Sequence, residues 1–107
     1  MSIKVVTMCG SMKFWDKIEE MSERLELEEG YVVIGMTPHV LDRELTTEEI
    51  DRMGELHRGK IDLSDAIYVV NVGGYIGESV RSEIEYAKTK GKDIMYLEVC
   101  AEGGKKI

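Results

Sequence analysis

The sequence predicts an α/β fold, a small doubly wound parallel sheet of about four strands with helices on both faces. Three observations lead to this fold. Short apolar runs without polar alternation are typical of strands that are buried on both faces. Amphipathic helical patterns separate these runs, as in successive strand–helix–strand units. Right-handed crossovers then place the four strands most simply in the order 2-1-3-4, a Rossmann- or flavodoxin-like arrangement.

The chain of 107 residues is long enough for a single domain, residues 1–107, with a real core. Its net charge of −7 argues against binding to a nucleic acid polymer, because no basic tract is present to displace counterions. The two cysteines, Cys9 and Cys100, show neither a CxxC pair nor metal-type spacing, so we expect no disulfide and no metal site. Seven methionines, and the lack of an apolar segment of membrane length, indicate a cytoplasmic protein without a membrane partner.

The first third of the chain predicts a strand, a helix and a second strand. Residues 3–9 form an apolar run that ends at Gly10 and Ser11. A helix follows, with Ser11 as its N-cap and Gly30 as its C′ residue. Residues 31–35 are predicted to form a second buried strand. The apolar side of the helix consists of Phe14, Ile18, Met21 and Leu25.

The middle of the chain predicts a loop and a second helix. Residues 36–45 are irregular and contain the chain's single proline, and a loop of this length beside strand ends is often functional. Thr46 and Glu49 have the spacing of a capping box, which opens the helix. Its apolar side is predicted to consist of Ile50, Met53, Leu56 or His57, and Ile61.

The last third predicts a strand, a helix and a final strand. Residues 66–72 form the third strand, and residues 93–99 form the fourth. The helix between them is ended by Gly91, and residues 101–107 are expected to be a polar tail. The core side of this helix consists of Val80, Ile84 and Ala87.

A glycine-rich turn joins the third strand to the third helix, and it predicts a phosphate cradle. Gly74, Gly77 and Ser79 lie where a strand end, a glycine loop and a helix N-terminus meet, which favours an anion. Ser79 is expected to cap the helix and to donate its hydroxyl to a phosphate oxygen. Arg81 either contributes a guanidinium fork or is a solvated helix charge. The turn is neither a Walker A sequence nor a GxGxxG fingerprint.

A second loop is expected to lie beside the glycine-rich turn. Cys9, Gly10 and Ser11 follow the first strand, and residues 73–79 follow the third. In the order 2-1-3-4 the chain reverses direction between these two strands, and ligands bind at the carboxyl ends of strands at such a switch point. Cys9 itself fits either this loop or a small buried apolar position.

Three side chains are candidates for catalysis: Glu83, His57 and Asp62. At about 100° per residue, Glu83 lies roughly 60° from the buried direction of its helix, so its carboxylate can line a crevice while partly desolvated. Glu85 lies roughly 140° away, toward solvent. The alternative for Glu83 is an ordinary boundary carboxylate. His57 is either a catalyst or a boundary residue, and Asp62 is either an acid or a local helix terminator.

At these residues the sequence resembles the nucleoside 2-deoxyribosyltransferase superfamily, which includes the 2′-deoxynucleoside 5′-phosphate N-hydrolases. Residues 9–13 are similar to the family's first loop near phosphate and sugar, and residues 64–70 to its "acid then apolar strand" segment. Residues 83–88, followed by Gly91 and Lys92, resemble its ELGYA…GK segment. The glycine turn also resembles the GGxGTxxE turn of phosphoribohydrolases. Where the family has an acid eight residues before its aspartate, here Asp65, this chain has His57.

The resemblance implies cleavage of the N-glycosidic bond of a nucleoside or nucleoside 5′-monophosphate, by hydrolysis or transfer, without a cofactor. The first glutamate of the matched segment, Glu83, is then the nucleophile, and His57 or Asp62 protonates the departing base. The resemblance also implies a homodimer or higher homo-oligomer. Two alternatives stay open: a nucleotide sensor that performs no chemistry, and a phage or mobile-element accessory protein that acts through a protein partner.

Overall fold

The computed structural model describes residues 3–98 and 105–106, and these form a parallel sheet with the strand order β2-β1-β3-β4-β5. The predicted order 2-1-3-4 is confirmed. The prediction of a polar tail after residue 100 is wrong at Lys105 and Lys106, whose backbone pairs with β4 as a short edge strand. Val99, Cys100 and the remainder of that tail lie outside the described residues. The strands are β1 (Val5–Gly10), β2 (Val32–Ile34), β3 (Ala66–Val70), β4 (Asp93–Tyr96) and β5 (Lys105–Lys106).

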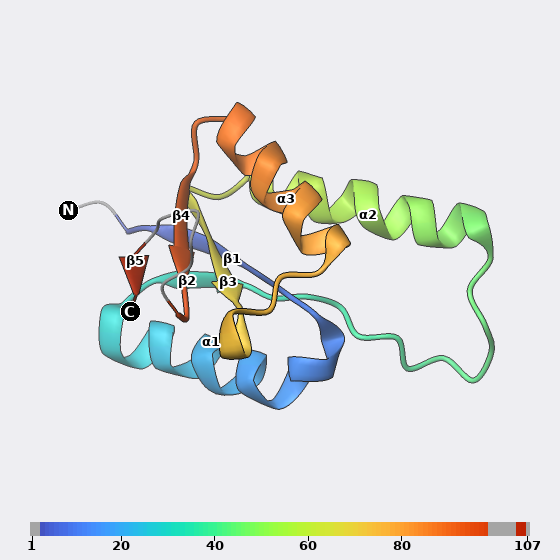
Figure 1. The fold of residues 1–107 in the computed structure, drawn as a ribbon, viewed down its shortest axis with the longest axis horizontal. Helices are drawn as coiled ribbons and strands as arrows, with labels where there is room; N and C mark the ends of the chain where they lie inside the picture. The colour runs from blue at the N-terminus through green and yellow to red at the C-terminus, as the bar shows by residue number, and fades with distance from the viewer. Residues whose placement is uncertain (1–2, 99–104, 107) are drawn as a thin grey trace.

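Helices cover both faces of the sheet (Figure 1). The helix α1 (Trp15–Glu29), which follows the short 3-10 helix η1 (Met12–Phe14), covers one face. The helices α2 (Thr47–Asp62) and α3 (Glu78–Thr89) cover the other. A second 3-10 turn, η2 (Val72–Gly74), lies between β3 and α3. No helix of the described residues is long and apolar enough to cross a bilayer.

Alternating side chains of the central strands divide the core into two clusters, because successive strand residues point to opposite faces. Met8 and Tyr68 face α1, whereas Cys9 and Val69 face α2 and α3. The predicted core side of α3, Val80, Ile84 and Ala87, is confirmed in the second cluster. The cluster under α2 and α3 therefore contains the residue that ends the first predicted apolar run, Cys9.

The boundaries of α1 follow the predicted signals. The side chain of Ser11 accepts a hydrogen bond from the Lys13 N–H at 3.4 Å and caps η1, which leads directly into α1. Gly30 ends α1 with a φ of 72°, a left-handed conformation that favours glycine. The prediction that residues 31–35 form a buried strand is wrong in part. Because β2 is the outer strand of the sheet, Val32 is 46% exposed.

The helix α2 begins as predicted and packs differently from the prediction. Thr46 and Glu49 form the full capping box, with bonds of 3.1 and 2.9 Å. Of the predicted apolar side, Ile61 is buried, whereas Ile50, Met53 and Leu56 are exposed. The amino-terminal half of α2 extends beyond the sheet beside the long loop after β2, so it has no strand to cover (Figure 1).

Candidate active site

Three side chains from three different elements meet on the face of the sheet that α2 and α3 cover. The Nε2 atom of His57 lies 3.3 Å from the Cys9 Sγ and 3.4 Å from the Glu83 Oε1. Cys9 comes from β1, His57 from α2 and Glu83 from α3. Cys9 is fully buried, and the side chains of His57 and Glu83 are 12% and 22% exposed. The thiol, imidazole and carboxylate therefore form one compact, largely desolvated cluster.

The sequence places two of the three, Cys9 and Glu83, by a local rule. Cys9 points toward α2 and α3 because strand residues alternate between faces. Glu83 precedes the buried Ile84, and the helical period turns its carboxylate toward the boundary, as predicted. Glu85 is exposed, with 64% of its side chain accessible, as predicted.

Burial governs the chemistry of the thiol. Desolvation raises the pKa of Cys9 well above its usual value, and the nearby carboxylate of Glu83 acts in the same direction. Cys9 therefore remains a protonated thiol, not a thiolate nucleophile, and its Sγ lies within hydrogen-bond distance of the His57 Nε2. The Glu83 Oε1 is buried and has no hydrogen-bond partner among the described residues. The nearby His57 Nε2 lies within ion-pair distance but outside hydrogen-bond geometry.

Two adjoining cavities open at Glu83. One, of about 240 Å³, is shared by Glu83 and His57, and the other, of about 360 Å³, extends to the amino terminus of α3. Met12, Met36 and Ser79 line both. The larger cavity is also lined by Gly10, Ser11, Tyr75, Gly77, Glu78 and Val80. The two loops that the sequence places at the switch point thus face one space with Glu83.

Aromatic contacts connect the two loops. The Lys13 Nζ lies 3.5 Å from the centroid of the Tyr75 ring, a cation–π contact. The ring of Phe14 meets that of Tyr75 edge to face, with centroids 5.9 Å apart. These contacts join η1, which follows β1, to the turn that follows β3.

The backbone of the glycine turn differs from the predicted phosphate cradle. The Gly73 N–H donates to the Glu98 carboxylate at 2.7 Å, and the Gly74 N–H donates to the Asn71 carbonyl at 2.8 Å. These amides are therefore already paired, and Gly74 does not line either cavity. The predicted cradle is therefore wrong in part, because these two amides are not available to a phosphate. Both glycines instead serve the turn itself, since their φ values of 64° and 83° are left-handed.

The amino terminus of α3 is the part of the turn that faces the cavity. Gly77 is the N-cap and makes no side-chain capping bond. The prediction that Ser79 caps the helix is wrong, because Ser79 lies inside the first turn. Exposed helix amides without a side-chain cap are suited to an anion. Glu78 is the acid of that first turn, and its charge opposes an anion there.

Gly10 lies where β1 leaves the sheet, at a position with little room for a side chain. A Cβ at this position would lie 3.3 Å from the Ile18 Cδ1, from the Val70 Cβ and from the Val70 carbonyl oxygen. The absence of a side chain allows β1 to end against β3 and α1 at the edge of the larger cavity.

Two predicted residues lie away from the cavities. Asp62 ends α2, where its carboxylate accepts the Tyr86 hydroxyl at 2.7 Å and its carbonyl accepts the Lys92 Nζ at 3.2 Å. It does not join His57 and Glu83 on either cavity wall. Arg81 is exposed and does not line them either. Asp65 has a structural role, since its carboxylate accepts the Val5 N–H at 2.8 Å.

Met36 and Lys60 are among the residues on the wall of the smaller cavity that sequence reasoning missed. Met36 follows the carboxyl end of β2, so the switch-point rule that selected the other loops also applies to it. Lys60 lies one helical turn after His57, on the same side of α2. Its Nζ donates to the Gly35 carbonyl at 3.0 Å and to the Thr37 hydroxyl at 3.3 Å, which anchors the long loop beside the cavity.

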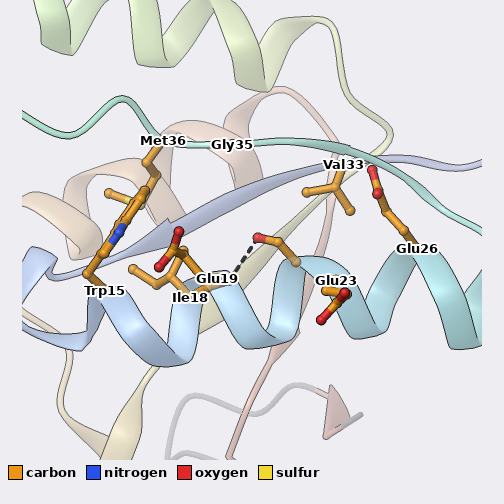
Figure 2. A pocket seen from close by; sticks show the side chains of 9 residues that line it. Trp15, Ile18, Glu19, Glu23, Glu26, Val33, Gly35 and Met36 are labelled. Atoms are coloured by element: carbon orange, nitrogen blue, oxygen red, sulfur yellow. Dashed lines mark hydrogen bonds between the residues drawn. The ribbon is translucent and has the colours of Figure 1, made fainter.

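A separate cavity of about 470 Å³ lies on the opposite face, between α1 and β2 (Figure 2). Figure 2 shows the carboxylates of Glu19, Glu23 and Glu26 along α1 beside it, with Trp15 at one end. This lining is unsuited to an anionic ligand, and it contains none of the predicted site residues.

Fold and site together define a doubly wound α/β protein with a buried carboxylate at its topological switch point. The structure is similar to that of the CMP N-glycosidase BcmB from Clostridium botulinum, with 22% sequence identity, a TM-score of 0.58, and coverage of 87% of this chain and 70% of that one. It is also similar to a conserved protein from Enterococcus faecalis V583, at 14% identity and a TM-score of 0.65, covering 94% of this chain and 66% of that one. No protein-family model and no curated protein matches the sequence.

Proposed function

We propose that this protein cleaves the N-glycosidic bond of a nucleoside or nucleoside 5′-monophosphate with Glu83 as the nucleophile. The observation that carries the proposal is the Glu83 carboxylate, which lines both cavities at the switch point while one of its oxygens, Oε1, is buried beside His57. A carboxylate with little solvation is well suited to attack an anomeric carbon. The structural similarity to a CMP N-glycosidase supports the same reaction class.

The reaction proceeds in two displacements. Glu83 attacks C1′ as an oxocarbenium-like state develops, the bond to the base breaks, and a glycosyl ester forms on the carboxylate. Water or a second base then attacks C1′ and releases Glu83, so the configuration at C1′ is retained. The larger cavity, which extends from Glu83 to the amino terminus of α3, orients the sugar so that C1′ lies within reach.

We assign His57 a positioning role. In a retaining glycosidase the acid lies across the scissile bond, about 5–5.5 Å from the nucleophile. The His57 Nε2 lies 3.4 Å from the Glu83 Oε1, which is too close for that place. The imidazole instead contacts the carboxylate at 3.4 Å and limits its movement. Protonation of the departing base then belongs to a group on the opposite side of the sugar.

A 5′-phosphate, when present, is assigned to the amino terminus of α3. Gly77 and Ser79 place uncapped amides and a hydroxyl at the end of the larger cavity away from His57. Glu78 lines the same cavity and repels a phosphate. Replacement Glu78→Gln is therefore expected to lower KM for nucleoside 5′-monophosphates and to leave KM for nucleosides unchanged.

The decisive experiment measures release of free base. The full chain is incubated with ribo- and deoxyribonucleosides and their 5′-monophosphates, with and without an acceptor base, and the products are separated by chromatography. Glu83→Gln and Glu83→Ala are expected to lower the rate by at least about 10³-fold. Glu85→Gln is the matched control, since Glu85 lies two residues away on the same helix and is exposed.

The outcomes separate the alternatives. Base release that survives both Glu83 substitutions removes Glu83 from the mechanism. Tight nucleotide binding in calorimetry, with the ligand recovered intact, makes the protein a sensor instead. Absence of nucleotide binding together with a stable complex in a pull-down makes it an accessory protein for a protein partner. Intact-mass spectrometry that detects a glycosyl adduct on the wild-type chain, absent in Glu83→Gln, supports the covalent route.

We also propose a homodimer through α2. Ile50 and Leu56 of α2 are 58% and 57% exposed. Ile50 also lines the smaller cavity, so a second copy on this face would close the site. Light scattering is expected to give a dimer that Ile50→Lys with Leu56→Lys converts to a monomer. The control Leu27→Lys, at an exposed position of α1, leaves the dimer intact.

A further inference from the structure

We propose that Cys9, His57 and Glu83 form a binding site for Zn²⁺ or a cation of the same class, with the fourth coordination position open to the smaller cavity. The metal competes with the substrate for Glu83, and this consequence rests on the proposed function. The binding site itself does not, because it follows from the donors and their spacing. The three donor atoms lie within 4.8 Å of one another.

The donor set selects the class of metal. A thiolate, an imidazole and a carboxylate are the ligands that Zn²⁺ takes, and three protein ligands with one open position are typical of zinc sites that admit water or substrate. Mg²⁺ and Ca²⁺ require several oxygen donors, and this cluster provides one carboxylate. The soft and borderline ligands Cys9 and His57 therefore favour Zn²⁺ over these hard cations.

The spacing of the donors matches a tetrahedral site. Zinc–ligand bonds of about 2.0–2.3 Å at tetrahedral angles place N and O atoms about 3.4 Å apart, and S and N atoms about 3.6 Å apart. The His57 Nε2 lies 3.4 Å from the Glu83 Oε1 and 3.3 Å from the Cys9 Sγ. These two distances match a tetrahedral site, and the third, between Cys9 and Glu83, is within 4.8 Å.

The surroundings favour capture of a cation. The Glu83 Oε1 is buried with no hydrogen-bond partner among the described residues, so its lone pairs are free to coordinate a metal. His57 and Glu83 line the smaller cavity, which provides an entry path. The Cys9 proton leaves on binding, since a coordinating thiol is deprotonated by the metal's charge. Zinc uptake is therefore accompanied by proton release.

The first test is a zinc titration of the metal-free full chain against a chromophoric chelator. Cys100→Ser is the background, because it removes the second thiol. We expect one Zn²⁺ per chain, and Cys9→Ser, His57→Gln and Glu83→Gln each to weaken binding by at least about tenfold, the loss that even an outer-shell partner causes. His39→Gln is the matched control, an exposed histidine that bonds the Arg43 carbonyl.

Cobalt provides a test that does not depend on the Cys9 variant being folded. Co²⁺ bound by the wild-type chain is expected to show strong visible bands of a tetrahedral site and a thiolate-to-cobalt charge-transfer band in the near ultraviolet. Weak octahedral bands without charge transfer overturn the proposal, as does a zinc affinity that none of the three substitutions changes.

Activity separates this inference from the proposed function. When zinc is added, base release by the wild-type chain is expected to fall and to return after addition of EDTA. Absence of base release from the metal-free chain overturns the proposed function and leaves the zinc titration valid. Base release with no zinc binding overturns the metal site alone.

Discussion

The His57 Nε2 and the Glu83 Oε1 lie 3.4 Å apart, although the two residues come from different helices and are both largely buried. Cys9 of the central strand β1 is the third member of the cluster, and its Sγ lies 3.3 Å from the His57 Nε2. The Glu83 carboxylate is therefore packed against His57 and is not free in solvent. The predictions about activity depend on this contact.

Replacement of His57 is expected to lower kcat more than it changes KM. His57→Gln removes the imidazole that positions Glu83, and misplacement of a nucleophile by about 1 Å can cost on the order of 10²-fold in rate. KM is expected to change little, because His57 contacts the Glu83 carboxylate and is not assigned a contact with the substrate. The measurement is steady-state kinetics with the released base as readout, at several pH values. An unchanged kcat with a raised KM would instead place His57 against the substrate.

Replacement of Asp62 is expected to leave activity unchanged. Asp62 accepts the Tyr86 hydroxyl at the carboxyl end of α2 and lines neither cavity. Base release by Asp62→Asn should stay within about twofold of the wild type, against a loss of about 10²–10⁴-fold for removal of a general acid. A large loss of kcat, with circular dichroism and melting temperature unchanged, would return Asp62 to the mechanism.

Two glycine-to-alanine substitutions are expected to act in opposite directions. Gly10→Ala places a Cβ 3.3 Å from three atoms of Ile18 and Val70 and should destabilise the fold by about 1–3 kcal/mol. Gly59→Ala, inside α2, meets nothing within 4 Å and should stabilise it by about 0.5–1 kcal/mol. Chemical denaturation measures both. A Gly10→Ala protein as stable as the wild type would show that Ile18 and Val70 can move to accept the methyl group.

The hydroxyl of Tyr68 is expected to make the fold sensitive to alkali. It is buried with no hydrogen-bond partner among the described residues, and burial raises its pKa from 10 to about 12, against a smaller opposing effect of Arg24. The raised value favours the folded state below pH 10, and this stability is lost as the pH rises toward 12. The loss is up to about 1.4 kcal/mol per pH unit.

Tyr68→Phe removes both the unpaired hydroxyl and its titration. Its stability near pH 7 should equal or exceed that of the wild type by up to about 1 kcal/mol, because no hydrogen bond is lost. Unfolding measured from pH 9 to 12 should show a steeper decline for the wild type than for Tyr68→Phe. Parallel declines would mean that the hydroxyl ionises equally in both states.

Local patterns in the sequence determined the architecture of this protein. The apolar runs and helical periods specify β1 to β4, the order 2-1-3-4 and the core side of α3. This is possible because a strand that is buried on both faces consists of nearly continuous apolar residues. The same patterns put the β1 loop and the α3 amino terminus at one sheet edge, and they turn Glu83 toward the boundary. The Thr46 capping box followed from two residues three positions apart.

Tertiary structure alone decided which of these residues meet. Cys9, His57 and Glu83 lie far apart along the chain and match no known motif, so their cluster could not be predicted from the sequence. The pairing of the Gly73 amide with Glu98 and the exposure of Ile50 depend on where a distant strand and the sheet edge lie. The period of a helix or strand fixes the direction in which a side chain points, whereas packing of the elements decides which residues it contacts.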